Sequence, residues 1–366
     1  MRVVIIADRL FASRERSMLA RLQVGLADEG LRVVQALPIG VEPASGGMLT
    51  ETVSFEETGP PFSLHRRAAV TAQALLDSAK ASDGDPPAVV HAFGSPVWDF
   101  GLALAEKLDA AFILEAWRAG LARAVQRSFT KAHGRAGQLV LCPDAKLAQQ
   151  LRTEIPEAVV RHSPWGVYTD EPTRPVLQPG KAWSIMIAGA GYDRLAFATA
   201  FEAIADIVRT RPDMLVFADA LAARRTDLWK LAARLGIRER LSLVDEMDTN
   251  RDLVLRGDML ILPEARGEQR TLVLEAMGRG MPVVAAADPL NGSLIDGRSA
   301  LLVPANERTR WVQQLEALLS TPELVTELTT SARAYIAEEH RPSRQVNCVI
   351  DAYEAAVGKK SIPFPG

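Results

Sequence analysis

The sequence predicts an α/β protein built from two doubly wound halves, each with a central parallel sheet. Short, continuous runs of Val, Ile and Leu alternate with segments of helical length along the whole chain, which is typical of βαβ units. This alternation is interrupted once, by a proline-rich stretch between Pro164 and Gly180, and then restarts. A length of 366 residues is enough for two domains of ordinary size.

The first half begins with a buried strand, because residues 3–7 form a continuous rather than an alternating apolar run. A helix over 14–29 follows, with Ser13 as its expected N-cap and Gly30 as its stop. The segment 39–61, rich in Gly, Pro and Glu, is expected to be a loop. The further strands are expected at 31–37, 88–91, 111–114 and 138–142, and the further helices at 65–80, 98–108, 118–132 and 146–153.

The second half repeats this pattern after the proline-rich stretch. Its strands are expected at 184–188, 214–218, 241–244, 259–262, 282–286 and 301–303. Its helices are expected at 195–210, 221–235, 271–279, 308–319, 322–340 and 344–357. Ligands of open α/β sheets bind at the carboxyl ends of the strands, so two such sheets facing each other predict a site in the cleft between them.

Composition excludes several classes of protein. Lys and Arg total 42 against 45 for Asp and Glu, a balance that argues against a nucleic-acid backbone as the main partner. Two cysteines, Cys142 and Cys348, cannot form a disulfide framework and favour a reducing compartment. The N-terminal apolar run is too short for a signal peptide, and no run approaches the roughly 18 apolar residues of a membrane span. We therefore expect a cytoplasmic protein.

Two segments of the second half carry a resemblance to a known family. The first reads LEAMGRGMPVVA over 274–285, after Ile261-Leu262-Pro263, and the second reads DGRSALLVP over 296–304. With weaker matches at 88–94 and 166–170, they make the chain similar to retaining glycosyltransferases of family 4, the glycosyl transferases group 1. The match is strong only from 183 to 357, and the string from Glu275 to Ala285 is its most specific part.

The resemblance implies a GT-B fold, in which two Rossmann-like domains face each other across a cleft. It places a Rossmann-like acceptor domain at 1–165, a linker at 166–180 and a nucleotide-sugar donor domain at 181–343. The last segment, 344–366, would hold a helix that crosses back to the first domain, followed by the C-terminal tail. The implied reaction moves a sugar from a nucleotide-sugar to a lipid-linked or saccharide acceptor, with retention and with no metal or other cofactor.

The donor domain of such an enzyme must supply positive charge and helix amides to the leaving nucleoside diphosphate. The helix that begins at Thr271 and Leu272 would supply the amides, and Glu275 resembles the carboxylate that hydrogen-bonds the donor ribose. The family's partner glutamate lies eight positions earlier, which here is Gly267, with Glu268 beside it.

The family's two diphosphate-binding cations are also missing. With Gly189 as the anchor, their positions hold Ala190 and Leu195. A hydrogen bond to a charged group contributes roughly 1.5–3 kcal/mol, so the two losses would cost about 3–6 kcal/mol of donor binding. We therefore hypothesise that Arg194 and Arg270 replace the missing cations and that Glu268 takes the sugar hydroxyl contact. The alternatives are that these are solvated loop charges, or that the protein is a catalytically silent partner of an active glycosyltransferase.

The acceptor side departs from the family pattern too. Trp117 stands where the family has its histidine on the catalytic face, and 10–13 replaces a Gly-Gly loop. His91 and Gly94, at the carboxyl end of their strand, are expected to face the acceptor, although a histidine packed in the core is at least as consistent with the pattern.

A basic segment without acids follows Trp117. It contains Arg118, Arg123, Arg127, Lys131, His133 and Arg135, interleaved with apolar residues. On a helix this spacing gives a basic amphipathic face, which would either be solvated or contact anionic lipid or an anionic acceptor at the inner face of the membrane. The nucleotide base, the sugar and the acceptor are not specified by the sequence.

Overall fold

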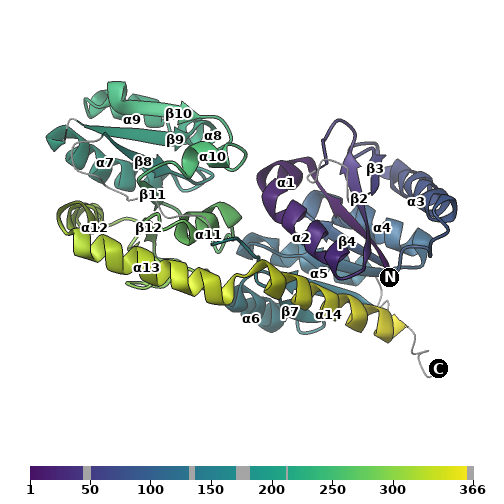
Figure 1. The fold of residues 1–366 in the computed structure, drawn as a ribbon. Coiled ribbons are helices and arrows are strands. Elements are labelled where there is room, and N and C mark those ends of the chain that lie inside the picture. Colours follow the sequence, from purple (N-terminus) through teal and green to yellow (C-terminus); the bar gives the residue numbers. More distant parts are fainter. Residues whose placement is uncertain (44–50, 132–136, 170–181, 212, 361–366) are drawn as a thin grey trace. The chain divides into compact units, whose positions relative to one another are not determined.

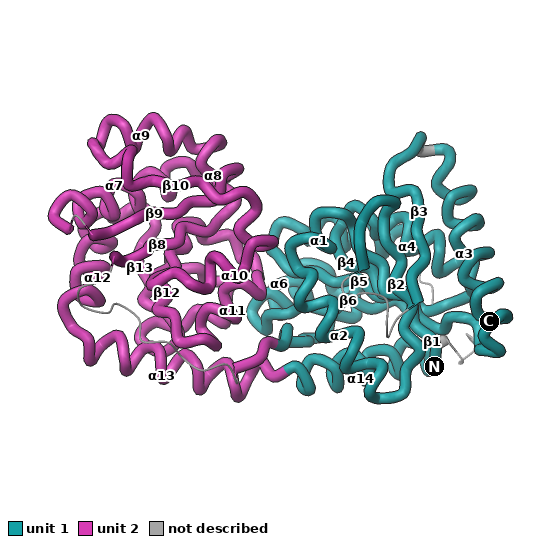
Figure 2. Tube along the Cα trace, turned by 45° about the horizontal axis from the view of Figure 1, so that its top comes forward, with its two compact units in different colours: residues 1–166, 342–366 teal, residues 167–341 magenta. Residues whose placement is uncertain are grey.

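The computed structural model describes residues 1–43, 51–131, 137–169, 182–211 and 213–360. The chain divides into two compact units (Figure 2). Unit 1 contains Met1–Gly166 together with the C-terminal segment from Pro342 on, and unit 2 contains Val167–Arg341. Much of the expected linker lies at 170–181, outside the described residues.

Unit 1 has a seven-stranded sheet in the order β3-β2-β1-β4-β5-β6-β7, and all its strand pairs are parallel. The order reverses between β1 and β4, which creates a switch point at the carboxyl ends of these strands. The central strands are buried along their whole length, which explains their continuous apolar runs. The strands are β1 (Arg2–Ala7), β2 (Arg32–Pro38), β3 (Glu51–Phe55), β4 (Val89–Phe93), β5 (Ala111–Glu115), β6 (Gln138–Cys142) and β7 (Val160–His162).

The helices of unit 1 follow the expected order, with one correction near the N-terminus. They are α1 (Arg9–Arg14), α2 (Arg16–Asp28), α3 (Leu64–Ala81), α4 (Trp98–Leu108), α5 (Ala122–Lys131), α6 (Ala145–Glu154) and α14 (Pro342–Lys360). The first predicted helix is two helices that meet at Glu15, and Ser13 is not a cap. Asp8 caps α1 instead, because its Oδ1 accepts a hydrogen bond of 2.9 Å from the Phe11 amide.

Unit 2 has six parallel strands in the order β10-β9-β8-β11-β12-β13. Counted from β8, this is the Rossmann order 3-2-1-4-5-6, with the switch point between β8 and β11. The strands are β8 (Trp183–Ile187), β9 (Met214–Asp219), β10 (Leu241–Val244), β11 (Met259–Leu262), β12 (Val283–Ala286) and β13 (Leu301–Val303). The sequence-based prediction of two parallel α/β sheets is therefore confirmed (Figure 1).

The helices of unit 2 are α7 (Arg194–Thr210), α8 (Ala220–Arg225), α9 (Leu228–Arg234), α10 (Arg251–Val254), α11 (Thr271–Gly278), α12 (Arg308–Ser320) and α13 (Pro322–Glu339). The helix expected at 221–235 is broken into α8 and α9. Asp227 adopts a left-handed conformation with φ of 53°, and the Thr226 hydroxyl closes α8 by donating to the Ala222 carbonyl at 2.8 Å. Helix α10, which the sequence analysis missed, is too short to show helical periodicity.

The C-terminal helix α14 belongs to unit 1 and packs against α2 and β5. Val346 of α14 packs directly on Gly25 of α2, where a Cβ would overlap the Val346 side chain. The two helices can approach this closely because residue 25 is glycine. The Gln345 Oε1 accepts a hydrogen bond of 2.9 Å from the Gly166 amide, at the last residue before unit 2. The helix thus ties the end of the first segment of unit 1 to its sheet.

Candidate functional site

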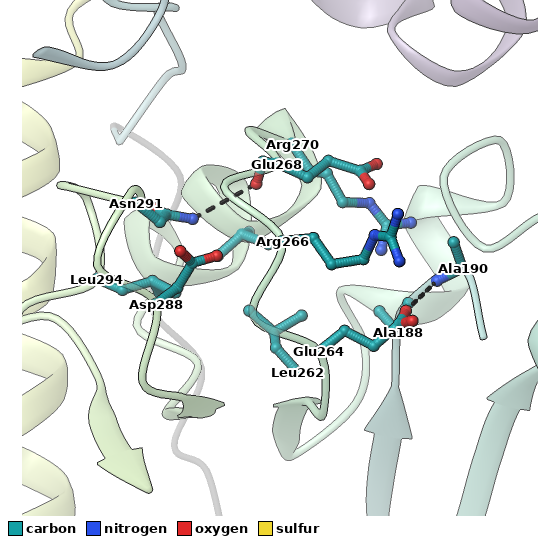
Figure 3. Close-up of a pocket in the computed structure, with 12 residues that line it drawn as sticks. Ala188, Ala190, Leu262, Glu264, Arg266, Glu268, Arg270, Asp288, Asn291 and Leu294 are labelled. Atoms are coloured by element: carbon teal, nitrogen blue, oxygen red, sulfur yellow. Dashed lines mark hydrogen bonds between the residues drawn. The ribbon is translucent and has the colours of Figure 1, made fainter. Parts of the chain in front are cut away.

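A small cavity of about 40 Å³ lies at the carboxyl ends of β8 and β11, next to the switch point of unit 2 (Figure 3). Its lining comes from the loops after β8, β11 and β12 and from the start of α11. The lining residues are Ala188, Gly189, Ala190, Leu262, Glu264, Arg266, Glu268, Arg270, Val273, Asp288, Asn291 and Leu294. This is the edge at which a Rossmann-ordered sheet binds its ligands, and the volume is far below the roughly 300–1,000 Å³ of sites for small molecules.

The loop after β8 is held against one wall of the cavity by the carboxylate of Glu264. Its Oε2 accepts hydrogen bonds from the amides of Ala190 at 2.8 Å and Gly191 at 3.0 Å, and its Oε1 accepts from the Asp193 amide at 2.7 Å. A Cβ on Gly189 would lie 2.9 Å from the same carboxylate. The loop therefore fits closely around Glu264, which had not been singled out in the sequence.

Two guanidinium groups lie beside this loop. The side chains of Arg225 and Arg266 lie over the ring of Tyr192, 4.3 Å and 4.6 Å from its centroid. Arg225 also donates to the Ala190 carbonyl at 2.7 Å. Within the described part of the chain, neither side chain forms an ion pair, so their charges are not balanced by a carboxylate in contact. In Figure 3 the Arg266 side chain extends across the cavity above Glu264.

A buried network of four charged side chains lies at the start of α11. Arg270 pairs with Asp248, and Arg251 of α10 pairs with Glu275 at 3.1 Å. The Arg251 Nη1 also donates to the Thr271 hydroxyl at 2.6 Å. Each arginine is thus paired with a carboxylate, and the two positive and two negative charges of the four side chains sum to zero.

This geometry corrects the hypothesis about the replacement cations. Arg194 is exposed, pairs with Asp227 and is not among the residues that line the cavity, so it does not lie where the diphosphate was expected. Arg270 does line the cavity, but Asp248 already balances its charge. Among the described residues, Arg266 lines the cavity and has no carboxylate partner. The spacing of the family motif gave no reason to choose it.

Of the other residues expected at the donor site, some line the cavity and others are buried beside it. Gly189 and Glu268 line the cavity, and the Gly267 amide donates to the Asp288 carboxylate at 2.6 Å. The Leu272 side chain is fully buried in the interior, so it could contribute only its backbone. Glu275 is 8% exposed and engaged by Arg251, and its contact with a ribose remains a prediction.

In unit 1 the expectation that His91 faces an acceptor is wrong. Its side chain is fully buried, with Nδ1 at 3.0 Å from the Tyr353 hydroxyl and Nε2 at 3.2 Å from the Glu115 carboxylate. The other Glu115 oxygen accepts a hydrogen bond of 2.7 Å from the Trp165 indole. Burial, with the nearby Glu115 charge, strongly raises the pKa of the Tyr353 hydroxyl. His91 thus joins β4, β5 and α14 inside unit 1, because its strand is central and both its nitrogens are occupied.

Gly94 and Trp117 lie at the carboxyl edge of the same sheet. Gly94 has φ of 86°, and a Cβ there would overlap the carboxylate of Asp8. Burial raises the pKa of the Asp8 carboxyl. The Trp117 ring is flanked by the guanidinium groups of Arg14 at 5.5 Å and Arg118 at 5.0 Å. Their contact with an acceptor stays a prediction.

The basic segment forms α5 only from Ala122, after a 3₁₀ turn at Ala119–Leu121. Arg123, Arg127 and Lys131 are exposed on it, and Lys131 pairs with Asp99 at 2.6 Å. His133 and Arg135 lie outside the described residues. In the described ranges there is no group of three or more His, Cys, Asp or Glu side chains that could hold a metal ion. No helix in those ranges is long and apolar enough to cross a membrane.

Two Rossmann-ordered parallel sheets in one chain, with a return of the last helix to the first unit, define the GT-B architecture of glycosyltransferases. Residues 182–321, which contain the cavity and the buried charged network at the start of α11, match the family model of the glycosyl transferases group 1.

Two curated relatives each match a little more than a third of the chain. An α-D-kanosaminyltransferase of Streptomyces kanamyceticus is 27% identical over 134 residues, and a D-inositol 3-phosphate glycosyltransferase of Streptomyces griseus is 30% identical over 138 residues. The matched residues are 36% and 37% of this chain and span 35% and 29% of those relatives. Over almost the whole chain, the fold is similar to the solved complex of Anabaena HepE with UDP and glucose. The TM-score is 0.72 at 12% identity, covering 97% of this chain and 100% of HepE.

Proposed function

We propose that the protein is a glycosyltransferase that moves a sugar from a nucleotide-sugar donor to an acceptor hydroxyl. Unit 2 would bind the donor and unit 1 the acceptor. The match of residues 182–321 to the glycosyl transferases group 1 carries this proposal, since the cavity at the switch point lies inside the matched residues. The complex of HepE with UDP and glucose supports a uridine nucleotide as the first donor to test.

We assign the diphosphate to the side of the cavity lined by Arg266, where the Arg225 guanidinium lies nearby over the same Tyr192 ring. A guanidinium binds two phosphate oxygens at once, and these two have no carboxylate partner in the described part of the chain. The amides at the start of α11, at Thr271 and Leu272, add the positive end of a helix. Glu275 would take the ribose hydroxyls, and Glu268, which lines the same cavity, would take a sugar hydroxyl.

The reaction would proceed with retention and without a metal. The bond between the sugar C1 and the phosphate oxygen breaks, and a bond from C1 to the acceptor oxygen forms on the same face. The acceptor proton passes to the departing phosphate. What the protein must supply is stabilisation of the negative charge that develops on that phosphate, which is the role given to the two arginines.

For the acceptor we propose a lipid-linked or saccharide hydroxyl at the carboxyl edge of the unit 1 sheet, near Gly94 and Trp117. Among the described residues, no carboxylate pairs with the exposed Arg123 and Arg127 of α5, so their charges are available to anionic lipid. They would hold the protein at the inner, cytoplasmic face of an anionic membrane.

The second candidate is a catalytically silent partner of an active glycosyltransferase. The pairing of Arg270 with Asp248 and of Glu275 with Arg251, together with the absence of the family's two cations at Ala190 and Leu195, favours it.

A thermal-shift series with UDP, GDP and ADP, followed by proton NMR of the sugar product, separates the two. A ligand that binds the folded state raises the unfolding temperature by mass action. If the protein is a transferase, one nucleotide should raise the unfolding temperature, and the protein should release that nucleotide from its nucleotide-sugar. The configuration at the sugar C1 should be the same in the product as in the donor. No shift with any of the three nucleotides would leave the silent partner as the function.

A further inference from the structure

The loop between β8 and α7 has the form of a phosphate-binding turn, but its amides are already occupied. In a Rossmann-ordered sheet, the glycine-containing turn after the first strand is where the phosphate of a bound nucleotide lies. Here that turn runs from Gly189 through Gly191, and its amides donate to the carboxylate of Glu264.

We propose that Glu264 is a built-in competitor of the donor's diphosphate, and that its carboxylate must leave the loop before the phosphate can bind. This inference rests on the proposed function, because it concerns the same donor site. It adds that the resting state is self-inhibited and that one residue sets the affinity for the nucleotide.

The geometry supports competition rather than a shared site. The carboxylate uses both oxygens on three amides at 2.7–3.0 Å, which leaves these three N–H groups with no capacity for a phosphate oxygen. On its other side the loop backbone packs closely against α8, since Gly191 has φ of 73° and a Cβ there would lie 2.7 Å from Ala222.

The local charge points the same way. Glu264 and the helix cap Asp193 both lie at the N-terminal end of α7, where they already offset the positive end of the helix dipole. A diphosphate brought to this turn would meet two carboxylates. When the Glu264 side chain moves away from the turn, this repulsion falls and the three amides become available to a phosphate oxygen. Arg266, which lines the same cavity, supplies the positive charge.

The experiment compares wild type with Glu264→Ala and Glu264→Gln in binding to inorganic pyrophosphate and to UDP, by isothermal calorimetry on the full chain. Alanine frees all three amides, and glutamine keeps an acceptor while removing the charge. We expect Glu264→Ala to bind both probes about tenfold more tightly or better, which corresponds to about 1.4 kcal/mol, and Glu264→Gln to gain less. Glu268→Gln is the matched control, since it removes the same charge from the same cavity without touching the loop amides.

A second readout protects the test against a folding defect. Without a ligand, Glu264→Ala should unfold at a lower temperature than wild type, because three amides lose their acceptor. Pyrophosphate should then raise its unfolding temperature more than that of wild type.

The outcomes separate this inference from the proposed function. If wild type binds UDP and Glu264→Ala binds it equally or more weakly, Glu264 is only a structural cap and the inference is wrong, while donor binding stands. Equal gains in Glu264→Gln and Glu268→Gln, with no further gain in Glu264→Ala, would reduce the effect to net charge and also overturn it. If no variant binds UDP or pyrophosphate, both the inference and the proposed donor site fail.

Discussion

The buried hydrogen bond between His91 and Tyr353 is expected to stabilise the packing of α14 on the sheet of unit 1. Tyr353→Phe removes one hydroxyl and keeps the ring, which packs edge-on against His91 with centroids 5.7 Å apart. Both side chains are 0% exposed, so no water is in place to satisfy the His91 Nδ1 after the change. A buried polar group that loses its partner costs about 1–3 kcal/mol.

Hydrogen exchange measured by mass spectrometry on peptides from β4 and α14 reports this local free energy. The expected cost corresponds to exchange that is about 5- to 140-fold faster in Tyr353→Phe than in wild type. Tyr192→Phe is the control, because it removes the same atom from a side chain that is 52% exposed, and it should leave these peptides unchanged. In a His91→Ala background, Tyr353→Phe should cost less than it does alone, since the partner is already gone. Exchange within twofold of wild type in Tyr353→Phe would refute the idea that this hydrogen bond holds the helix.

Three further predictions concern the two units separately. Burial lowers the pKa of His162 below its usual 6.5, so the unfolded state binds more protons at this residue than the folded state does. The free energy of unfolding should therefore fall as the pH drops below 6.5. Urea titrations at several pH values should show a weaker pH dependence in His162→Gln. Gly30→Ala has no neighbour within 4 Å and should cost about 1–2 kcal/mol of unfolding free energy, the cost of its left-handed backbone alone. Gly94→Ala, at nearly the same φ, should cost more, because the Asp8 carboxylate must also move out of its capping position. Arg266→Ala should weaken UDP binding by about 10- to 140-fold in calorimetry, and Arg194→Ala should leave it unchanged. A loss in Arg194→Ala but not in Arg266→Ala would return the diphosphate contact to Arg194.

The sequence predicts the central strands and most helices well because their signals are local. Strand β6 and helix α4 begin and end where the apolar pattern predicts, since a buried parallel strand is a continuous apolar run with polar ends. Strands β3 and β7 are missed because edge strands are short or polar, as Glu51, Thr52 and Ser54 in β3 illustrate.

The site is less accessible to sequence reasoning because its chemistry depends on loops. The spacing from Gly189 shows that the family's two cations are missing at Ala190 and Leu195. It does not show which nearby arginine side chain lies in the cavity. Arg194 is closer to the lost position along the chain, yet its ion pair with Asp227 draws it to the surface. Glu264 contacts amides more than seventy residues away, a pairing that only the adjacency of β8 and β11 creates. The sequence could not decide between an acceptor-facing and a core His91 for the same reason, since its partner Tyr353 lies on a helix that returns from the far end of the chain.

Unit 2 is proposed to hold a nucleoside diphosphate at the carboxyl ends of β8 and β11. A crystal structure of the protein soaked with UDP would show whether it does. We expect phosphate oxygens within hydrogen-bond distance of the Arg266 guanidinium, with the Glu264 side chain turned away from the amides of Ala190 and Gly191. UDP bound elsewhere in unit 2, or a site that stays empty at saturating UDP with Glu264 still in place, would overturn this assignment.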